Sequence, residues 1–159
     1  MTLVKVLRAT LVGLFTSVFI SAGAVQAEER GTVAEAKAMA EKAIAHMNAA
    51  GKEKAFADFT AKDTGWQSKD LYVFAIAYDG DVQAHGANKA LVGKNLLVLK
   101  DPSGKSFIKE FAEIAKSKGS GWVDYQFSDP QTKKNLPKTS YIIKWPAGDG
   151  YVGVGVYKQ

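Results

Sequence analysis

The stretch that most constrains the fold runs from residue 71 to residue 85, where two largely apolar runs meet at Asp79-Gly80. Asp-Gly favours the positive backbone dihedrals of a two-residue type I′ turn, so the stretch is predicted to form a β-hairpin. That turn implies a register in which three pairs of residues face each other: Phe74 and His85, Ile76 and Gln83, and Tyr78 and Asp81.

The predicted hairpin has two unlike faces, because side chains alternate along a strand. One face is apolar and mostly small, as suits a helix lying close on a sheet: Leu71, Val73, Ala75, Ala77, Val82 and Ala84. The other face combines aromatic rings with polar ends: Tyr72, Phe74, Ile76, Gln83 and His85. This mixed face is typical of a ligand pocket wall, and equally of a core with one hydrogen-bonded histidine at its rim.

The N-terminus carries the pattern of an export signal. Lys5 and Arg8 precede an apolar run, and Val25-Gln26-Ala27 supplies the small residues that a signal peptidase requires. Residues 1–27 are therefore predicted to be a signal peptide and residues 28–159 a single domain, periplasmic or secreted. An uncleaved membrane anchor is the alternative, although the main apolar run is short for a membrane span.

Composition and motifs exclude several classes of protein. The chain of 159 residues has no cysteine, which excludes disulfides, thiol catalysis and thiolate metal sites. Without Lys5 and Arg8, 19 basic residues face 16 acidic ones, a small and dispersed excess that does not indicate nucleic acid binding. Only two histidines are present, and motifs for a nucleophile, a metal or a phosphate are missing. Neither an enzyme, a metal nor a cofactor is predicted.

The first half of the domain is predicted to be helical. Thr32 and Glu35 fit a capping box for a helix that ends at Gly51. One stripe of this helix is small and should pack on the small face of the hairpin: Ala36, Ala40, Ala43 and Met47. A short helix is expected at 53–60. Trp66, in the loop that follows, either closes the edge of the core or covers a cavity.

The second half is predicted to contain a helix at 107–118, capped by Ser106, and strands at 122–127, 138–145 and 151–157. With the hairpin, this gives an α+β fold: a long N-terminal helix packed on a five-stranded antiparallel sheet. The irregular segment 86–104 should cover the mixed face with four apolar residues: Leu91, Val92, Leu96 and Leu99. In the last strand, Gly153 and Gly155 indicate a close approach by a helix or a ligand.

Aromatic and cationic residues gather on the predicted C-terminal strands: Trp122, Tyr125, Lys138, Tyr141 and Lys144. Rings, hydroxyl groups and one ammonium would suit a small carboxylate, since a buried anion must be paired and hydrogen-bonded. Lysines on strands are usually solvated, however. A regular strand would also place Lys138 and Tyr141 on opposite faces.

Several motifs, in their order along the chain, resemble the single Cache domain family, the extracytoplasmic sCache_2-like sensor domains. They are Leu71-Tyr-Val-Phe-Ala-Ile-Ala-Tyr-Asp-Gly80, Ala84-His85, Val92-Gly-Lys-Asn-Leu96, Lys100-Asp-Pro-Ser-Gly104, Gly119-Ser-Gly-Trp-Val-Asp-Tyr125, Lys138-Thr-Ser-Tyr141 and the closing strand from Gly153. The resemblance covers about residues 32–157. It implies a PAS-like sheet and sensing of small molecules, frequently organic acids, as in chemoreceptors and histidine kinases.

Carried onto this sequence, the resemblance implies a set of ligand-binding candidates: Tyr72, Phe74, His85, Trp122, Tyr125, Lys138 and Tyr141. Lys138 would pair with a carboxylate, Tyr125 and Tyr141 would donate hydrogen bonds, and Trp122 and Phe74 would form walls. The loop after His85 departs from the family, because Gly86 replaces a frequent proline.

The expected function follows from this resemblance and from the lack of a second membrane segment or an output domain in the sequence. It is a free-standing periplasmic protein that binds a small carboxylate and signals through a membrane receptor or kinase, with homodimerisation through the N-terminal helix as an option. The alternative is a Cache-like scaffold that has lost its ligand and docks on a receptor or enzyme.

Overall fold

One antiparallel sheet organises the computed structural model, which describes residues 29–158; the predicted signal peptide lies outside this range. The elements follow in the order α1 (Val33–Ala50), α2 (Lys52–Thr60), β1 (Gln67–Ser68), β2 (Leu71–Ala77), β3 (Val82–His85), the 3-10 helix η1 (Lys89–Leu91), α3 (Phe107–Lys118), β4 (Ser120–Ser128), β5 (Asn135–Lys144) and β6 (Gly150–Tyr157). Both β1 and β3 pair with β2, and β6, β5 and β4 follow in that order.

The α+β fold with a long N-terminal helix is confirmed, and the sheet has one strand more than predicted. The additional strand, β1, has two residues and lies within a stretch that the sequence indicates as loop. Two residues are too few to display an alternating pattern, so a strand this short leaves no signal in the sequence. Within residues 29–158, no helix has the length and apolar character needed to span a membrane.

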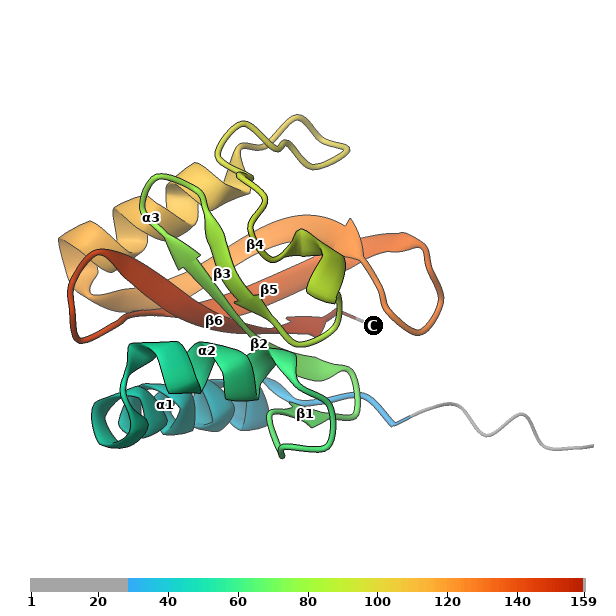
Figure 1. Cartoon of the computed structure of the whole chain (residues 1–159). Coiled ribbons are helices and arrows are strands. Elements are labelled where there is room, and N and C mark those ends of the chain that lie inside the picture. Colours follow the sequence, from blue (N-terminus) through green and yellow to red (C-terminus); the bar gives the residue numbers. More distant parts are fainter. Residues whose placement is uncertain (1–28, 159) are drawn as a thin grey trace, which may run out of the picture.

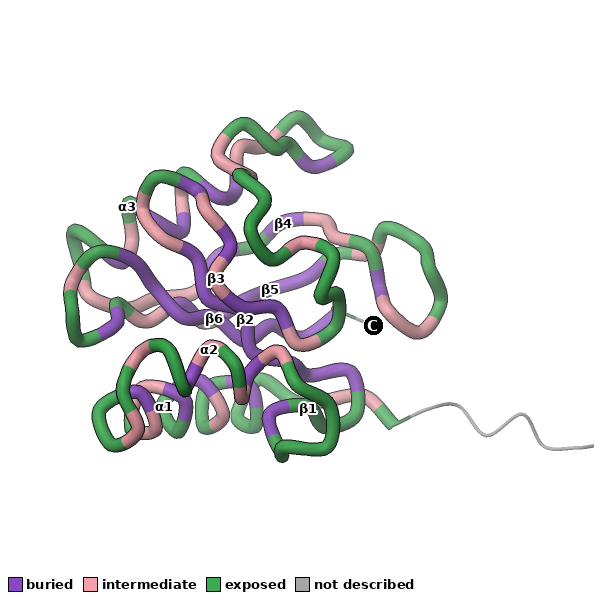
Figure 2. The backbone as a smooth tube through the Cα atoms, viewed as in Figure 1, coloured by how far each residue is buried: buried purple, intermediate pink, exposed green. Residues whose placement is uncertain are grey.

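The sheet is covered on both faces, which gives the domain two separate apolar cores. Helices α1 and α2 lie on one face, while α3 and the connecting segment 86–106 lie on the other (Figure 1). Buried residues are concentrated in the central strands, and most residues of the surrounding loops are exposed or half-buried (Figure 2). Alternate residues of each central strand therefore contribute to different cores, one beneath the helices and one that holds the candidate pocket.

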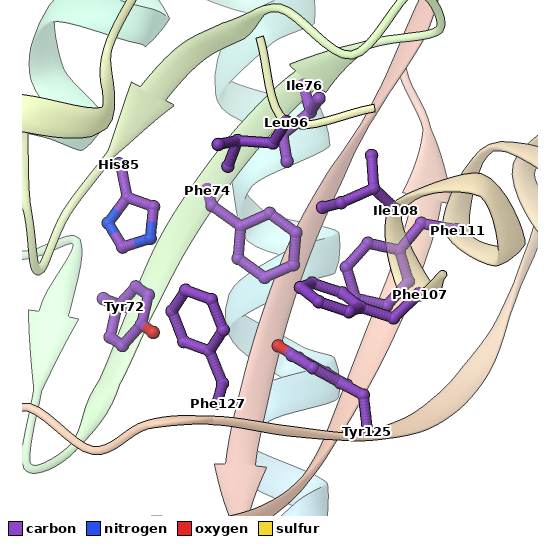
Figure 3. Close-up of a pocket in the computed structure, with 10 residues that line it drawn as sticks. All are labelled: Tyr72, Phe74, Ile76, His85, Leu96, Phe107, Ile108, Phe111, Tyr125 and Phe127. Atoms are coloured by element: carbon purple, nitrogen blue, oxygen red, sulfur yellow. The ribbon is translucent and has the colours of Figure 1, made fainter. Parts of the chain in front are cut away.

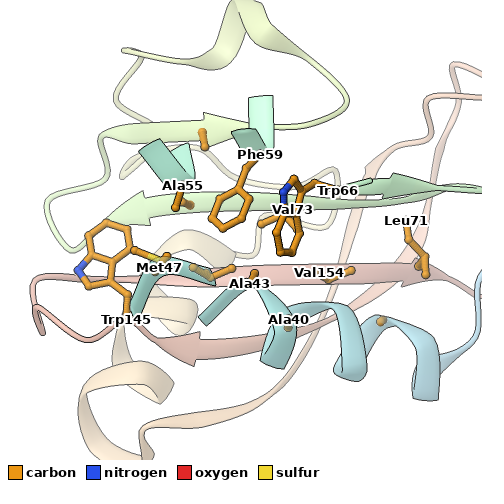
Figure 4. Close-up of a cluster of buried hydrophobic side chains, with 14 of the residues drawn as sticks. Ala40, Ala43, Met47, Ala55, Phe59, Trp66, Leu71, Val73, Trp145 and Val154 are labelled. Atoms are coloured by element: carbon orange, nitrogen blue, oxygen red, sulfur yellow. The ribbon is translucent and has the colours of Figure 1, made fainter. Parts of the chain in front are cut away.

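The core beneath α1 forms as the sequence predicts. The capping box of Thr32 and Glu35 is present, and α1 buries the predicted stripe of Ala36, Ala40, Ala43 and Met47. These small side chains allow α1 to lie close on β6, β5 and β2, while α2 covers β2 and β3. Trp66 is buried among the same residues and closes the edge of this core (Figure 4).

The hairpin differs from the predicted register at its tip. The Ala77 amide donates to the Asp81 carbonyl across a three-residue loop, in which Gly80 has a φ of 97°. Phe74 faces His85 as predicted, but a bulge makes Ile76 face Val82 instead of Gln83. Because a bulge adds one unpaired residue, Val82 moves to the mixed face and into its core. The predicted two-residue type I′ turn is therefore wrong.

The segment 86–106 is fixed to the sheet at two points. The Asn95 side chain donates to Asp81 Oδ1 (2.8 Å) and to the Asp79 carbonyl (2.9 Å). Asp101 accepts hydrogen bonds from the amides of Ser103, Lys105 and Gln126, the last of which belongs to β4. Between these two points the chain crosses the mixed face as a strap, defined here as residues 96–100.

Three other details of this half correct the sequence analysis. Leu91 and Leu96 pack on the mixed face, but Val92, which follows η1, and Leu99, which lies in the strap, are each 36% exposed. Ser106 precedes α3 without a side-chain capping bond. The space beside Gly153 and Gly155 is filled by Phe74 and Lys138 from neighbouring strands, rather than by a helix.

Candidate functional site

The candidate site is an aromatic pocket between the mixed face of the sheet, α3 and the strap (Figure 3). The side chains that line it come from β2, β3, β4, α3 and the strap: Tyr72, Phe74, Ile76, His85, Leu96, Phe107, Ile108, Phe111, Tyr125 and Phe127. Polar atoms occur only at the ends of Tyr72, His85 and Tyr125. The pocket therefore has an apolar interior with a few polar groups at one side.

The pocket consists of a tight inner cavity and a wide outer hollow. The inner cavity has a volume of about 20 Å³, which is room for about one water molecule. The outer hollow has a volume of about 540 Å³ and is bordered by Asn88, Asp129 and Lys133, among others. Tyr72, His85 and Phe127 line both spaces, so these three rings separate the inner cavity from the hollow.

Lys138 lies beside this pocket with its ammonium group buried. Its Nζ donates to Tyr72 Oη (2.7 Å) and Tyr157 Oη (3.4 Å), and it lies 4.1 and 4.5 Å from the centroids of those two rings. No carboxylate of residues 29–158 comes within the 4.0 Å of an ion pair. Burial lowers the pKa of Lys138 to about 7, although Asp70 and Asp129 act to raise it.

Register explains why this cation is surrounded by tyrosines. Lys138 is the direct cross-strand neighbour of Tyr125 on β4 and of Tyr157 on β6. Gly155, on the same face of β6, leaves the space through which the lysine chain passes. The Tyr125 hydroxyl is hydrogen-bonded to Ser140 Oγ at 2.9 Å, and burial raises the pKa of Tyr125 well above its ordinary value.

His85 offers a neutral hydrogen-bond donor to the pocket. Burial, together with the charge of Lys138, lowers its pKa to about 3. Its Nδ1 accepts from the Asn88 amide (3.0 Å), so the neutral ring carries its proton on Nε2. Figure 3 shows one ring nitrogen turned towards Phe74 and Phe127. A neutral donor beside a cation can orient a carboxylate without a further charge.

The structure brings together five of the seven predicted site residues: Tyr72, Phe74, His85, Tyr125 and Lys138. Trp122 and Tyr141 lie on the opposite face of the sheet, packed against the core beneath α1. The Tyr141 hydroxyl donates to Ser120 Oγ there, and its ring is 5.0 Å from that of Trp122. Strict alternation along β4 and β5 separates them from Lys138, so they do not line this pocket.

Sequence reasoning missed the remaining aromatic side chains of the site, on α3, β4 and β6: Phe107, Phe111, Phe127 and Tyr157. Phe107 and Phe111 belong to the predicted helix 107–118, which the sequence does not relate to the site. A signal for Tyr157 was present, since Tyr151, Gly153, Gly155 and Tyr157 alternate along one face of a strand. The pairing of β5 with β6 was needed to place it beside Lys138.

The site has no arrangement typical of a metal centre or of covalent catalysis. In the part of the chain that the structure describes, no cluster of three or more histidine and carboxylate side chains could hold a metal ion. The arrangement is instead typical of a small-molecule pocket: aromatic side chains on one face of an antiparallel sheet, a buried cation beside them and a covering strap.

The chain belongs to the Cache domain family, whose family model, designated dCache_2, matches residues 32–159. Cache domains are extracytoplasmic sensor domains of chemotaxis receptors and are not enzyme domains. The resemblance drawn from the sequence is confirmed at the level of this family.

Relatives and solved structures agree with this assignment. The chain is 32% identical over 73 residues to the methyl-accepting chemotaxis protein McpP of Pseudomonas putida, a match over 46% of this chain and 13% of that protein. A methyl-accepting chemotaxis protein from Vibrio parahaemolyticus shares the fold with a TM-score of 0.66 and 26% identity, over 78% of this chain and 86% of that structure. A Cache chemosensory domain described as recognising carboxylic acid has a TM-score of 0.63 at 23% identity, over 77% and 86%.

Proposed function

We propose that this protein is an exported sensor that binds a small carboxylate of two to four carbons beside Lys138. The observation that carries the proposal is the buried ammonium of Lys138, which has phenol groups but no carboxylate of residues 29–158 as partners. A buried charge is costly unless it is paired, so a cation in this state favours an anionic ligand. The Cache domain described as recognising carboxylic acid has the same fold, which is compatible with this choice.

The proposed ligand orientation follows from the distribution of polar groups. Lys138, Tyr72 and His85 supply a cation and two donors near the three rings that separate the hollow from the inner cavity. The alkyl end would point towards Phe107 and Phe111. Because the inner cavity has room for only about one water molecule, binding requires outward movement of side chains such as Leu96 or Phe127.

A second function is favoured by the small inner cavity itself. If Leu96 and Phe127 fill the pocket permanently, the protein is a ligand-free scaffold that docks on a membrane receptor or enzyme. In that case a partner would bind whether or not a small molecule is present. The two functions differ in whether any carboxylate stabilises the folded chain.

Thermal-shift measurements with a panel of C2 to C4 carboxylates, amines and amides separate the two functions. A ligand that binds only the folded state raises its melting temperature, so at least one carboxylate should do so. The shift should vanish in Lys138→Met and persist in Lys144→Met, the matched control at an exposed lysine of β5. A flat panel would reject the sensor function, and an equal shift in Lys138→Met would remove Lys138 from the site.

We also propose how ligand binding is passed on to another protein. The protein would act as a free-standing periplasmic protein that presents its ligand state to a membrane receptor or kinase, with α1 as a candidate homodimer surface. The match to McpP covers 13% of that protein, so most of the relative lies outside the matched region. Crosslinking in intact cells, with and without the carboxylate found by thermal shift, would test for such a partner.

A further inference from the structure

Three charged side chains, Arg30, Asp70 and Asp129, connect the segment before α1 to the far end of the sheet. The Arg30 guanidinium donates to both oxygens of Asp129 (2.9 and 2.8 Å) and to Asp70 Oδ2 (3.2 Å). Asp70 also accepts from the Gly31 amide at 2.6 Å. Two parallel hydrogen bonds to one carboxylate fix orientation as well as distance. These three residues are called the Arg30 clamp.

The clamp is buried and fully bonded, which distinguishes it from a surface ion pair. Both carboxylates are 0% exposed and the Arg30 side chain is 17% exposed. Asp129 additionally accepts from the Gln131 amide and from the amide and hydroxyl of Thr132, and so holds the β4–β5 loop in place. The bond from Arg30 lowers the pKa of Asp129 below its ordinary range. Movement of this loop would therefore change the hydrogen bonds between Asp129 and Arg30.

The clamp also adjoins the ligand site through Tyr157. Arg30 Cζ lies 5.6 Å from the centroid of the Tyr157 ring, and Lys138 Nζ lies 4.5 Å from the same centroid. Its hydroxyl donates to the Ser128 carbonyl (2.7 Å), the residue before Asp129. Asp129 itself borders the outer hollow. One ring thus lies between the proposed ligand cation and the residue that enters α1.

Charge connects the same groups. The clamp has two carboxylates and one guanidinium, so it has one excess negative charge, which a protonated Lys138 offsets. The charged and polar groups around Lys138, from every element packed against it, are Arg30, Asp70, Tyr72, His85, Tyr125, Asp129 and Tyr157. A carboxylate bound at Lys138 would neutralise the positive charge of Lys138 and so weaken its attraction for Asp70 and Asp129. Arg30 would then be the main cation that interacts with these two carboxylates.

We propose that the Arg30 clamp couples occupancy of the Lys138 pocket to the segment that leads into α1, with Arg30 as the positioning residue. The coupling rests on the proposed carboxylate site. Ligand binding strengthens the attraction between Arg30 and its two carboxylates and tightens residues 29–32. In Figure 1 this segment, the β4–β5 loop and the end of β6 lie at the same end of the domain, so the signal would leave there.

The first test needs no ligand. The titration of Lys138 is followed by NMR of protein labelled with ¹³C-lysine, in the wild type, Arg30→Gln and Arg30→Lys. Loss of the guanidinium charge leaves both carboxylates free to favour protonated Lys138, so its midpoint should rise by about one pH unit in Arg30→Gln. Arg30→Lys keeps the charge and should stay near the wild type, whereas general loosening of the fold would affect both variants. An unchanged midpoint in Arg30→Gln, or equal shifts in both variants, would overturn the inference.

The second test measures hydrogen exchange of residues 29–36 with and without saturating propionate. Propionate should slow exchange in the wild type and have no effect on this segment in Arg30→Gln. If propionate raises the melting temperature but leaves exchange unchanged, the coupling is refuted while the proposed function stands. If propionate and every other carboxylate of the C2 to C4 panel fail to bind and the Lys138 midpoint still depends on Arg30, the carboxylate function and its coupling both fail, and only a structural charge network remains.

Discussion

At the scale of single residues, Lys138 places a charge where charges are costly. Its side chain is 1% exposed, and its partners are two phenols and three ring faces. A residue chosen for stability alone at this position would be apolar, because similar burial of a methionine would need no hydrogen-bond partners. The arrangement is typical of a functional site that is maintained at a cost in stability.

Replacing this lysine should therefore stabilise the ligand-free protein at pH 7. We expect Lys138→Met to raise the free energy of unfolding by about 1–4 kcal/mol, because a buried methionine of similar volume avoids the desolvation of a charge. Urea unfolding monitored by circular dichroism gives this difference. A clear loss of stability would show that the hydrogen bonds to Tyr72 and Tyr157 outweigh the burial of the charge.

The same residue should give the stability a specific pH dependence. Burial lowers the pKa of Lys138 from 10.5 to about 7 in the folded state. Between these values the unfolded chain binds more protons, so the contribution of Lys138 to the free energy of unfolding rises with pH, by at most about 1.4 kcal/mol per pH unit. The stability of the wild type relative to Lys138→Met should increase between pH 7 and pH 9. Parallel stability curves would mean that Lys138 titrates normally.

At the scale of elements, the hairpin loop and the strap support each other. Gly80 lies against the strap, where an added Cβ would come within 2.6 Å of Leu97 Cβ. The Leu96 amide donates to the Gly80 carbonyl, and Asn95 bonds the loop from the other side. The position of Leu96 over the pocket therefore depends on a glycine in the hairpin loop.

This dependence can be measured by comparing two glycines of similar conformation. Gly80 and Gly93 have φ angles of 97° and 79°, but an added Cβ at Gly93 meets no atom within 4 Å. Gly93→Ala should cost about 1–2 kcal/mol for the left-handed backbone alone. Gly80→Ala should cost about 1–3 kcal/mol more, because the methyl group overlaps the strap. Chemical denaturation of both variants tests this, and equal losses would show that the strap yields freely.

At the scale of the whole molecule, the sheet separates two tasks. The face beneath α1 and α2 is filled by small and aliphatic side chains together with Phe59, Trp66 and Trp145, and it holds the domain together. The opposite face carries the rings, the cation and the strap. Because each central strand contributes alternate residues to both cores, the face with the candidate pocket and the face beneath the helices are two sides of the same strands.

The N-terminal segment predicts that the whole protein is exported and that residues 1–27 are removed. Expressed from the full sequence, the protein should be recovered in the periplasmic fraction, and its mass should correspond to a chain that begins at Glu28. The small residues Val25 and Ala27 determine that position. A membrane-bound product that retains residues 1–27 would support the uncleaved anchor instead.

Strand alternation in the sequence predicts some residues of the candidate site but not others. Tyr72, Phe74, His85 and Tyr125 line one pocket and Lys138 lies beside it, because alternation is a local property that can be followed along each strand. Alternation also places Lys138 and Tyr141 on opposite faces of a regular strand, which conflicts with their joint assignment to one site. The continuous register of β5 shows that they are indeed on opposite faces. The bulge in the hairpin, which brings Val82 into the pocket core, depends on packing against segment 86–106 and has no local signal.

The sequence by itself determined the three α-helices, the five longer strands and the two-faced character of the sheet, because periodicity and caps act over short distances. Only the tertiary structure decided which strands are neighbours, and so placed Tyr157 beside Lys138. It also brought Arg30 to Asp129, 99 residues apart in the chain. Contacts of this kind form only once the sheet has assembled, since no local pattern relates residues that are distant along the chain.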